Sequence, residues 1–160
     1  MTTQLTPPLT LPDPHLPFEH QHPLILLSMA IWGESRGEGM AGKIGVACVV
    51  RNRVGYQGKY GEGFAGVTLK PFQFSSFNAN DPNRAKLLEP LDHDSVDVWQ
   101  ACLTAAHVVY WGSQSDTTQG AVFYYSKPLK APPTKHDGTC AWGSVEHCVD
   151  IGGLSFWREA

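Results

Sequence analysis

A glutamate on the apolar side of a predicted helix is the residue in this chain best suited to acid–base chemistry. Glu34 continues an apolar pattern with spacings of three, four and three residues, formed by Leu24, Leu27 and Ile31. On a helix that begins after Pro23, this spacing places the Glu34 carboxyl on the core-facing side. Burial raises the pKa of a carboxyl, and an acid that stays protonated near neutral pH can protonate a glycosidic oxygen. The alternative is an ordinary solvated glutamate at a fraying helix end.

The segment around Glu34 is rich in glycine, which predicts a break between two helices. The helical period is interrupted at Gly33, Gly37, Gly39 and Gly42. We expect the chain to leave the first helix near Gly33, to make an open turn and to enter a second helix at about Met40. Such a junction leaves backbone groups unpaired and lets a ligand come close. Glu38 lies in the turn and is interpreted as a carboxylate that holds Arg36 or a backbone N–H.

Two further helices are predicted to position this junction. The second helix runs over 40–54 and stops at Gly55, and the basic residues at its end can satisfy its last carbonyls. A third helix begins after a cap at Asp94 or Ser95 and stops at Gly112. These helices supply most of the expected core.

The rest of the chain predicts loops and short strands. Residues 55–66 hold five glycines and three aromatics, which favours a loop whose rings either face sugars or pin the loop to the core. Two apolar runs, 120–125 and 151–157, have the pattern of short strands. The predicted fold class is therefore α+β, a mainly helical single domain with a few short strands.

Composition indicates one globular domain. The chain has 160 residues, of which 42% are hydrophobic and 17% charged, and its net charge is −3. A mildly acidic chain has no electrostatic reason to bind nucleic acid. No apolar stretch is long enough for membrane insertion, and we expect a monomer.

The first 22 residues differ from the remainder. They are rich in proline, contain no glycine and show no sustained apolar period. We expect a flexible segment over 1–22, with partner docking as the alternative, followed by the catalytic domain over 23–160. The segment lacks the basic region, apolar region and cleavage site of a signal peptide.

The cysteines prompt a test for cross-links and metal. Cys140 and Cys148 lie near two histidines, but the spacing matches no compact zinc motif. A disulfide between these two cysteines and a structural zinc site are the alternatives, while Cys48 and Cys102 lie on apolar helix faces as buried thiols. We predict no metal and no cofactor.

Two segments resemble a known family of enzymes. Residues 34–39, Glu-Ser-Arg-Gly-Glu-Gly, and 45–54, Gly-Val-Ala-Cys-Val-Val-Arg-Asn-Arg-Val, are similar to the E-A-R-G-E and A-x-V-V-x-N-R-V elements of the spore cortex-lytic enzyme type of cell wall hydrolase. The Glu-Ser pair also resembles the start of lytic transglycosylase and goose-type lysozyme active sites. Both families cleave peptidoglycan, so the resemblance implies a lysozyme-like or lytic transglycosylase-like fold.

Elements further along the chain extend the resemblance to about 24–157. Residues 73–75, Gln-Phe-Ser, match a family element that lines the cleft opposite the glutamate. The two predicted strands resemble G-A-x-x-F-Y and I-G-x-H-x-F-Y, although Leu154 stands where the second pattern has His. The resemblance also implies that the Asn-Arg-Val end of the second helix frames the cleft.

The candidate site has one catalytic residue, Glu34, and a set of substrate-binding residues: Ser35, Glu38, Gln73, Ser75, Tyr124 and Tyr125. The Gln73 amide can hold an N-acetyl group or a sugar hydroxyl. Alternate side chains of a strand face opposite ways, so we expect one of the two tyrosines to point into the cleft and the other to pack.

The predicted activity is cleavage of the β-1,4 bond between N-acetylmuramic acid and N-acetylglucosamine in bacterial peptidoglycan. A hydrolase needs a second carboxylate, and none has a setting comparable with that of Glu34. A lytic transglycosylase needs only one, because the same carboxylate can deprotonate the muramic acid 6-hydroxyl and so close a 1,6-anhydro ring. The alternatives are a muramidase and a non-catalytic wall-binding virion module. A chain with Met1 and no export signal fits a phage endolysin that stays in the host cytoplasm until release.

Overall fold

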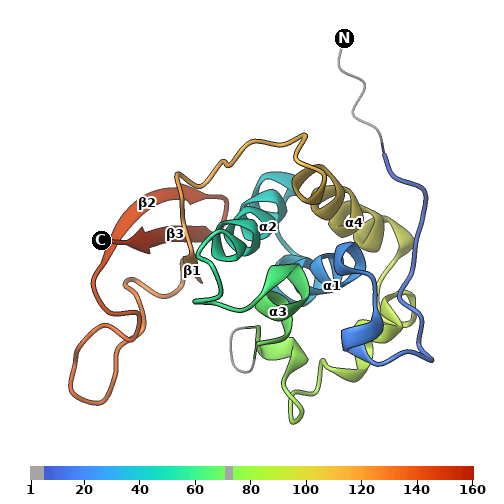
Figure 1. The fold of residues 1–160 in the computed structure, drawn as a ribbon, viewed down its shortest axis with the longest axis horizontal. Coiled ribbons are helices and arrows are strands. Elements are labelled where there is room, and N and C mark those ends of the chain that lie inside the picture. Colours follow the sequence, from blue (N-terminus) through green and yellow to red (C-terminus); the bar gives the residue numbers. More distant parts are fainter. Residues whose placement is uncertain (1–5, 71–73) are drawn as a thin grey trace.

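The protein is mainly helical, with a small sheet beside the helices (Figure 1). The computed structural model describes residues 6–70 and 74–160. Within these residues the helices are α1 (Pro23–Ser35), α2 (Met40–Val54), α3 (Gly63–Leu69) and α4 (Val96–Tyr110). The strands are β1 (Phe123–Ser126), β2 (Val145–Ile151) and β3 (Leu154–Glu159), and four short 3-10 turns are η1 (Phe18–His20), η2 (Ser75–Phe77), η3 (Ala85–Leu88) and η4 (Pro90–Asp92). The predicted α+β class is confirmed.

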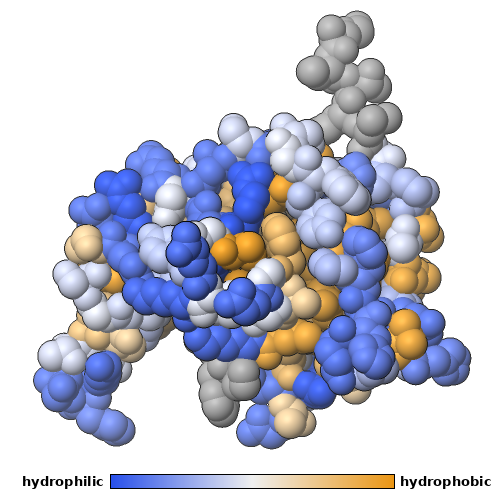
Figure 2. Space-filling model, viewed as in Figure 1, coloured by the Kyte–Doolittle hydropathy of each residue, from blue (hydrophilic) through white to orange (hydrophobic). Residues whose placement is uncertain are grey.

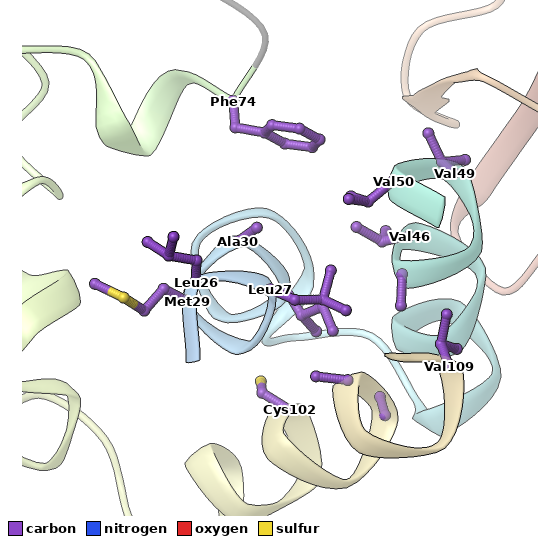
Figure 3. Close-up of a cluster of buried hydrophobic side chains, with 14 of the residues drawn as sticks. Leu26, Leu27, Met29, Ala30, Val46, Val49, Val50, Phe74, Cys102 and Val109 are labelled. Carbon is purple, nitrogen blue, oxygen red and sulfur yellow. The ribbon is translucent and has the colours of Figure 1, made fainter. Parts of the chain in front are cut away.

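Helix α1 lies at the centre of the core. Its middle residues have no exposed surface on any side: Leu26, Leu27, Met29, Ala30, Ile31 and Trp32. A helix that is apolar all round is stable only when neighbours cover every face, and here α2, α3 and α4 all contact it. Figure 3 shows Leu27 directed toward α2 and α4, Leu26 and Met29 directed to the opposite side of α1, and Phe74 above the helix. The end of α1 is therefore held firmly by the core.

Helix boundaries follow the prediction closely, with two corrections. The second helix occupies the predicted residues, and the third ends before Gly112, whose φ of +79° an L side chain rarely adopts. The first helix continues to Ser35 rather than leaving near Gly33, because the Ser35 hydroxyl and backbone still bond within the last turn. The predicted loop over 55–66 ends early, since α3 already begins at Gly63.

The sheet is antiparallel with strand order β1-β3-β2. The expectation of one strand over 151–157 is wrong, because Ile151 ends β2, Gly152 and Gly153 form a turn, and Leu154 starts β3. Gly152 has φ +57°, a turn conformation that glycine adopts without strain. Strand β2 was not predicted from its sequence, which lacks a clear apolar alternation.

The sheet packs on α2 through a glycine. A Cβ atom added at Gly45 would lie 2.6 Å from Cζ of Phe156, which is fully buried. Because Phe156 pairs with Tyr124 in the sheet register, this contact fixes β1 and β3 against the helical body. The tip of the connection between β1 and β2 instead stands away as a hydrophilic lobe (Figures 1 and 2).

The segment before α1 is described from residue 6 to residue 22. These residues are largely extended, yet they lie against the helical body. The indole N–H of Trp99 donates to the Thr10 carbonyl at 2.8 Å, and the Gln100 amide donates to the Pro7 carbonyl at 2.8 Å. Phe18 is buried against Phe77. Proline stiffens this segment, so ordering it loses little chain entropy.

No helix within the described residues is long and apolar enough to cross a membrane.

Candidate active site

A cleft of about 550 Å³ opens between the helical body and the sheet. Both parts of the fold contribute to its walls, and charged and aromatic side chains dominate the lining. The lining residues are Glu34, Arg53, Lys59, Tyr60, Lys70, Phe123, Tyr124, Ala141, Trp142 and Glu159. The cleft thus contains the predicted catalytic carboxyl.

Glu34 enters the cleft from the last turn of α1 and is half-buried. Burial raises the pKa of its carboxyl above the usual glutamate range. Hydrogen bonds from the Tyr124 hydroxyl and the Ser75 backbone N–H, and the positive charge of Arg53, oppose this rise. Compared with an exposed glutamate, the carboxyl is therefore shifted towards its protonated form, while hydrogen-bond donors are already placed for the ionised form.

Close packing beside Gly33 brings the Ser75 N–H to this carboxyl. A Cβ at Gly33 would lie 2.5 Å from the Ser76 hydroxyl oxygen, so any other residue would push η2 away from α1. Ser76 is itself buried. Gly33 thus allows the approach of η2, a different role from the predicted end of the helix.

Arg53 forms a cationic wall beside Glu34. It is 6% exposed, and its Nε donates to the Val122 carbonyl at 2.7 Å. Its guanidinium lies over the rings of Tyr60, Phe74 and Phe123 at 5.4, 5.3 and 5.8 Å. Burial lowers its pKa, and nearby Tyr124, Tyr60 and Glu34 act in the opposite direction. A guanidinium stays charged in such settings, so Arg53 is a fixed positive charge.

Arg51 and Asn52, which precede Arg53, donate hydrogen bonds to backbone carbonyls. Arg51 Nη1 donates to the carbonyls of Val109 at 3.1 Å and Gln114 at 2.7 Å. Asn52 Nδ2 donates to the Ala121 carbonyl at 2.9 Å. The end of α2 therefore holds the segment that leads into β1, and only Arg53 of the three reaches the cleft.

The two neighbouring tyrosines separate as expected for a strand. Tyr124 lines the cleft and bonds to Glu34. Tyr125 does not line it, and its ring lies 6.2 Å from both Trp142 and Trp157. Tyr125 packs against these rings, and its substrate-binding role stays a prediction.

Ser35 and Glu38 also lie away from the cleft. Ser35 is 3% exposed, and its hydroxyl donates to the Ile31 carbonyl at 3.0 Å, because the helix continues through it. The Glu38 carboxylate accepts the Gly153 backbone N–H at 2.7 Å and thereby ties the α1–α2 turn to the β2–β3 turn. It holds a backbone N–H, as interpreted from the sequence, and it does not line the cleft.

The Gln-Phe-Ser element is only partly described. Gln73 lies outside the described residues. Ser75 contributes its backbone N–H to Glu34, whereas its side chain is exposed. Phe74 is buried beneath Arg53.

Several cleft residues were not predicted, including a second carboxylate. Glu159 accepts the Tyr60 hydroxyl at 2.5 Å and forms an ion pair with Lys59. Hydrogen bonds from Lys59 and Tyr60 lower the pKa of Glu159, so it is ionised near neutral pH. Glu159 lies in the last strand, 125 residues from Glu34 in the chain, and no local pattern marks this pairing.

The loop aromatics of residues 55–66 mainly pin the loop. Tyr60 is buried, with its ring 6.0 Å from that of Phe123, and Phe64 packs against Tyr110 at 5.0 Å.

The four cysteines, all within the described part of the chain, are free thiols. Cys140 and Cys148 are not bridged, which is contrary to the disulfide alternative. Among the described residues, no three His, Cys, Asp or Glu side chains converge as a metal site would require.

Comparison with known proteins gives one family match and two similar solved structures. The sequence profile of the Cell Wall Hydrolase family matches residues 37–156, beginning three residues after Glu34. The catalytic domain of the germination-specific lytic transglycosylase SleB from Bacillus anthracis is 22% identical, with a TM-score of 0.58 over 92% of this chain and 100% of that chain. The catalytic domain of the Bacillus cereus SleB protein is 24% identical, with a TM-score of 0.55 over 85% and 89%. No curated protein sequence matches. At these identities the structural likeness concerns the fold.

Proposed function

Because this chain belongs to the Cell Wall Hydrolase family, we propose that it cleaves the β-1,4 bond between N-acetylmuramic acid and N-acetylglucosamine as a lytic transglycosylase. The observation that carries the proposal is the half-buried Glu34 in the cleft, bonded to Tyr124 and the Ser75 N–H. The name of the similar Bacillus anthracis protein, a lytic transglycosylase, supports the same outcome.

In the first step, Glu34 acts as general acid. Burial raises its pKa, which favours the protonated carboxyl, and the proton passes to the glycosidic oxygen as the bond to C1 of muramic acid breaks. The N-acetylglucosamine side leaves as an alcohol. Positive charge develops on the muramic acid ring while Glu34 becomes a carboxylate, so the two charges attract.

In the second step, the same group acts as base. The Glu34 carboxylate takes the proton from the muramic acid 6-hydroxyl, and O6 bonds to C1 to close the 1,6-anhydro ring. The Tyr124 hydroxyl and Ser75 N–H stabilise the carboxylate between the two steps, and Arg53 adds positive charge beside it. The enzyme ends with Glu34 protonated again, and no water is consumed.

Glu159 favours a second candidate activity, hydrolysis by a muramidase. A hydrolase uses a second carboxylate as nucleophile or as base for water, and Glu159 lines the same cleft. Lys59 and Tyr60 both donate to its Oε1, and its pKa is lowered, so it is a weak base. For this reason transglycosylation remains the preferred proposal.

Glutamine variants of Glu34 and Glu38 test the assignment of Glu34 as the general acid. Glu34→Gln keeps the shape of the side chain but cannot transfer a proton, so release of soluble glycan from purified sacculi should fall by about 10² to 10⁴-fold. Glu38→Gln is the matched control, because Glu38 bonds only to structure outside the cleft, and it should retain most of the rate. Retention of activity in Glu34→Gln together with loss in Glu38→Gln would contradict the assignment. Binding to sacculi without any release by the parent protein would indicate the non-catalytic wall-binding module.

We also propose a role in host cell lysis, as a phage endolysin that accumulates in the cytoplasm. A peptidoglycan glycosidase that is held in the cytoplasm reaches its substrate only after the membrane is opened. The opening of the membrane therefore sets the time of lysis. Expression in a bacterial cytoplasm should leave cells intact until a membrane-permeabilising agent is added, and the Glu34→Gln protein should then fail to clear the culture. Lysis of unpermeabilised cells would oppose this setting.

A further inference from the structure

An indole side chain lines the cleft, and the proposed mechanism does not use it. Trp142 stacks on Phe123, with ring centroids 4.8 Å apart and an interplanar angle of 7°. Its ring centroid is 6.2 Å from that of Tyr125. Phe123 and Tyr125 are alternate residues of β1 and therefore lie on the same side of the strand. Phe123 covers one face of the indole, while Trp142 remains half-buried and lines the cleft with Glu34.

The support beneath this indole is rigid. Phe123 is 8% exposed and is held by the ring of Tyr60 and the Arg53 guanidinium. The chain around Trp142 is fixed as well, since the Ala141 N–H donates to the Pro133 carbonyl at 2.8 Å and the Gly143 N–H to the Cys140 carbonyl at 3.1 Å. A braced aromatic ring loses little conformational entropy when a ligand packs on it.

We propose that the outer face of Trp142 is a sugar-binding platform, on which one N-acetylhexosamine ring of the glycan stacks while the scissile bond lies at Glu34. A pyranose ring presents a face of C–H groups, which pack on an aromatic face and meet its negative π surface. Lys59, Lys70 and Glu159 lie in the same cleft and offer polar partners for hydroxyl and N-acetyl groups. The platform recognises the neutral sugar ring rather than the peptide stem. The inference rests on the proposed function.

The sharpest test compares two apolar substitutions of the same residue. Both Trp142→Leu and Trp142→Phe fill the position with a hydrophobic side chain, but only Phe retains an aromatic face. Trp111→Ala is the matched control, because Trp111 is 63% exposed at the end of α4 and does not line the cleft. Thermal unfolding of each variant establishes that the fold is retained.

Binding is measured in the Glu34→Gln background, which should hold substrate without cleaving it. The probe is a neutral N-acetylglucosamine tetramer. Its binding is measured by calorimetry and by quenching of tryptophan fluorescence. Trp142→Leu should weaken binding by about tenfold or more, whereas Trp142→Phe should stay within a few-fold of the parent and Trp111→Ala should match it. Equal affinity for the parent and Trp142→Leu would overturn the platform and leave Trp142 as a packing residue.

Kinetics on purified peptidoglycan separate this inference from the proposed function. With Glu34 intact, Trp142→Leu should raise KM more than it lowers kcat, because the platform binds a ring remote from the reacting atoms. A parent enzyme that releases no glycan fragments would refute the proposed function. A parent that cleaves normally, with an unchanged KM in Trp142→Leu, would refute only the platform.

Discussion

At the scale of single residues, Glu34 combines two opposing influences. Burial favours its neutral form, and the donors from Tyr124 and Ser75 favour its charged form. A group that must act first as acid and then as base needs both influences, because either one alone would hold it in one state.

This conflict predicts a pH-dependent gain of stability in Glu34→Gln. The pKa of Glu34 is raised in the folded protein, so the folded state binds more protons than the unfolded state between the ordinary glutamate pKa of about 4.3 and the raised value. The contribution of Glu34 to stability is therefore fully present below that window and is lost as the pH rises through it. We define the gain as the melting temperature of Glu34→Gln minus that of the parent at the same pH. Calorimetry should show a larger gain at pH 7 than at pH 4. A gain that is the same at both pH values would contradict the raised pKa.

Tyr124→Phe should shift the pH profile of the reaction. Its hydroxyl stabilises the ionised Glu34, so its removal raises the Glu34 pKa further. The acid then stays protonated to higher pH, and the basic limb of kcat/KM should move upward, while kcat falls roughly tenfold because the carboxylate loses a charge-assisted hydrogen bond.

Tyr125→Phe is the control. Tyr125 does not line the cleft, so this substitution should leave the pH profile of kcat/KM unchanged. A basic limb that does not move in Tyr124→Phe would show that the hydroxyl does not act on Glu34.

At the scale of elements, two glycines set how closely the parts of the site approach. Gly33 admits η2 against α1, and Gly45 admits β3 against α2. The first approach delivers the Ser75 N–H to Glu34, and the second brings β1 with Tyr124 to the same carboxyl. Both hydrogen bonds to the acid thus depend on positions where no side chain fits.

Gly33→Ala should therefore damage both stability and activity. The new Cβ would lie 2.5 Å from the Ser76 hydroxyl oxygen, and overpacking of this kind lowers the free energy of unfolding by about 1–3 kcal/mol. Gly37→Ala is the control, because no atom lies within 4 Å of its added Cβ. Thermal melts and rates on sacculi should show loss in Gly33→Ala alone. Equal behaviour of the two variants would mean that η2 does not press on α1.

Sequence patterns predict elements well where the signal is local. Helix α2 could be bounded at both ends because Met40 follows a glycine-rich turn and Gly55 follows the last apolar position. Strand β2 could not, since its stability comes from pairing with β3 rather than from its own pattern. Glu34 could be found from its spacing on α1. Trp142 and Glu159 could not, because their place in the cleft depends on contacts between segments distant in the chain.

At the scale of the whole molecule, the sign of charge in the cleft differs from that of the chain. The net charge is −3, yet Arg53, Lys59 and Lys70 line the cleft against one ionised carboxylate, Glu159, when Glu34 is protonated. Overall acidity therefore does not prevent an anionic polymer from being attracted to the site.

Cleavage of peptidoglycan should accordingly weaken with salt. Exposed charges are screened over about 10 Å at 0.1 M ionic strength, so kcat/KM should fall as salt is added. Lys70→Gln should lower kcat/KM at low salt and differ little from the parent at high salt. A neutral N-acetylglucosamine oligomer should show neither effect. Salt dependence that is unchanged in Lys70→Gln would place the electrostatic attraction elsewhere.

The most direct test of the single-carboxyl mechanism is mass spectrometry of soluble fragments released from purified peptidoglycan. We expect muropeptides that end in 1,6-anhydro-muramic acid, one water lighter than hydrolysed fragments, because Glu34 deprotonates the 6-hydroxyl and O6, rather than water, bonds to C1. Reducing muramic acid ends would contradict this account. They would assign the chain as a muramidase and make Glu159 its second carboxylate.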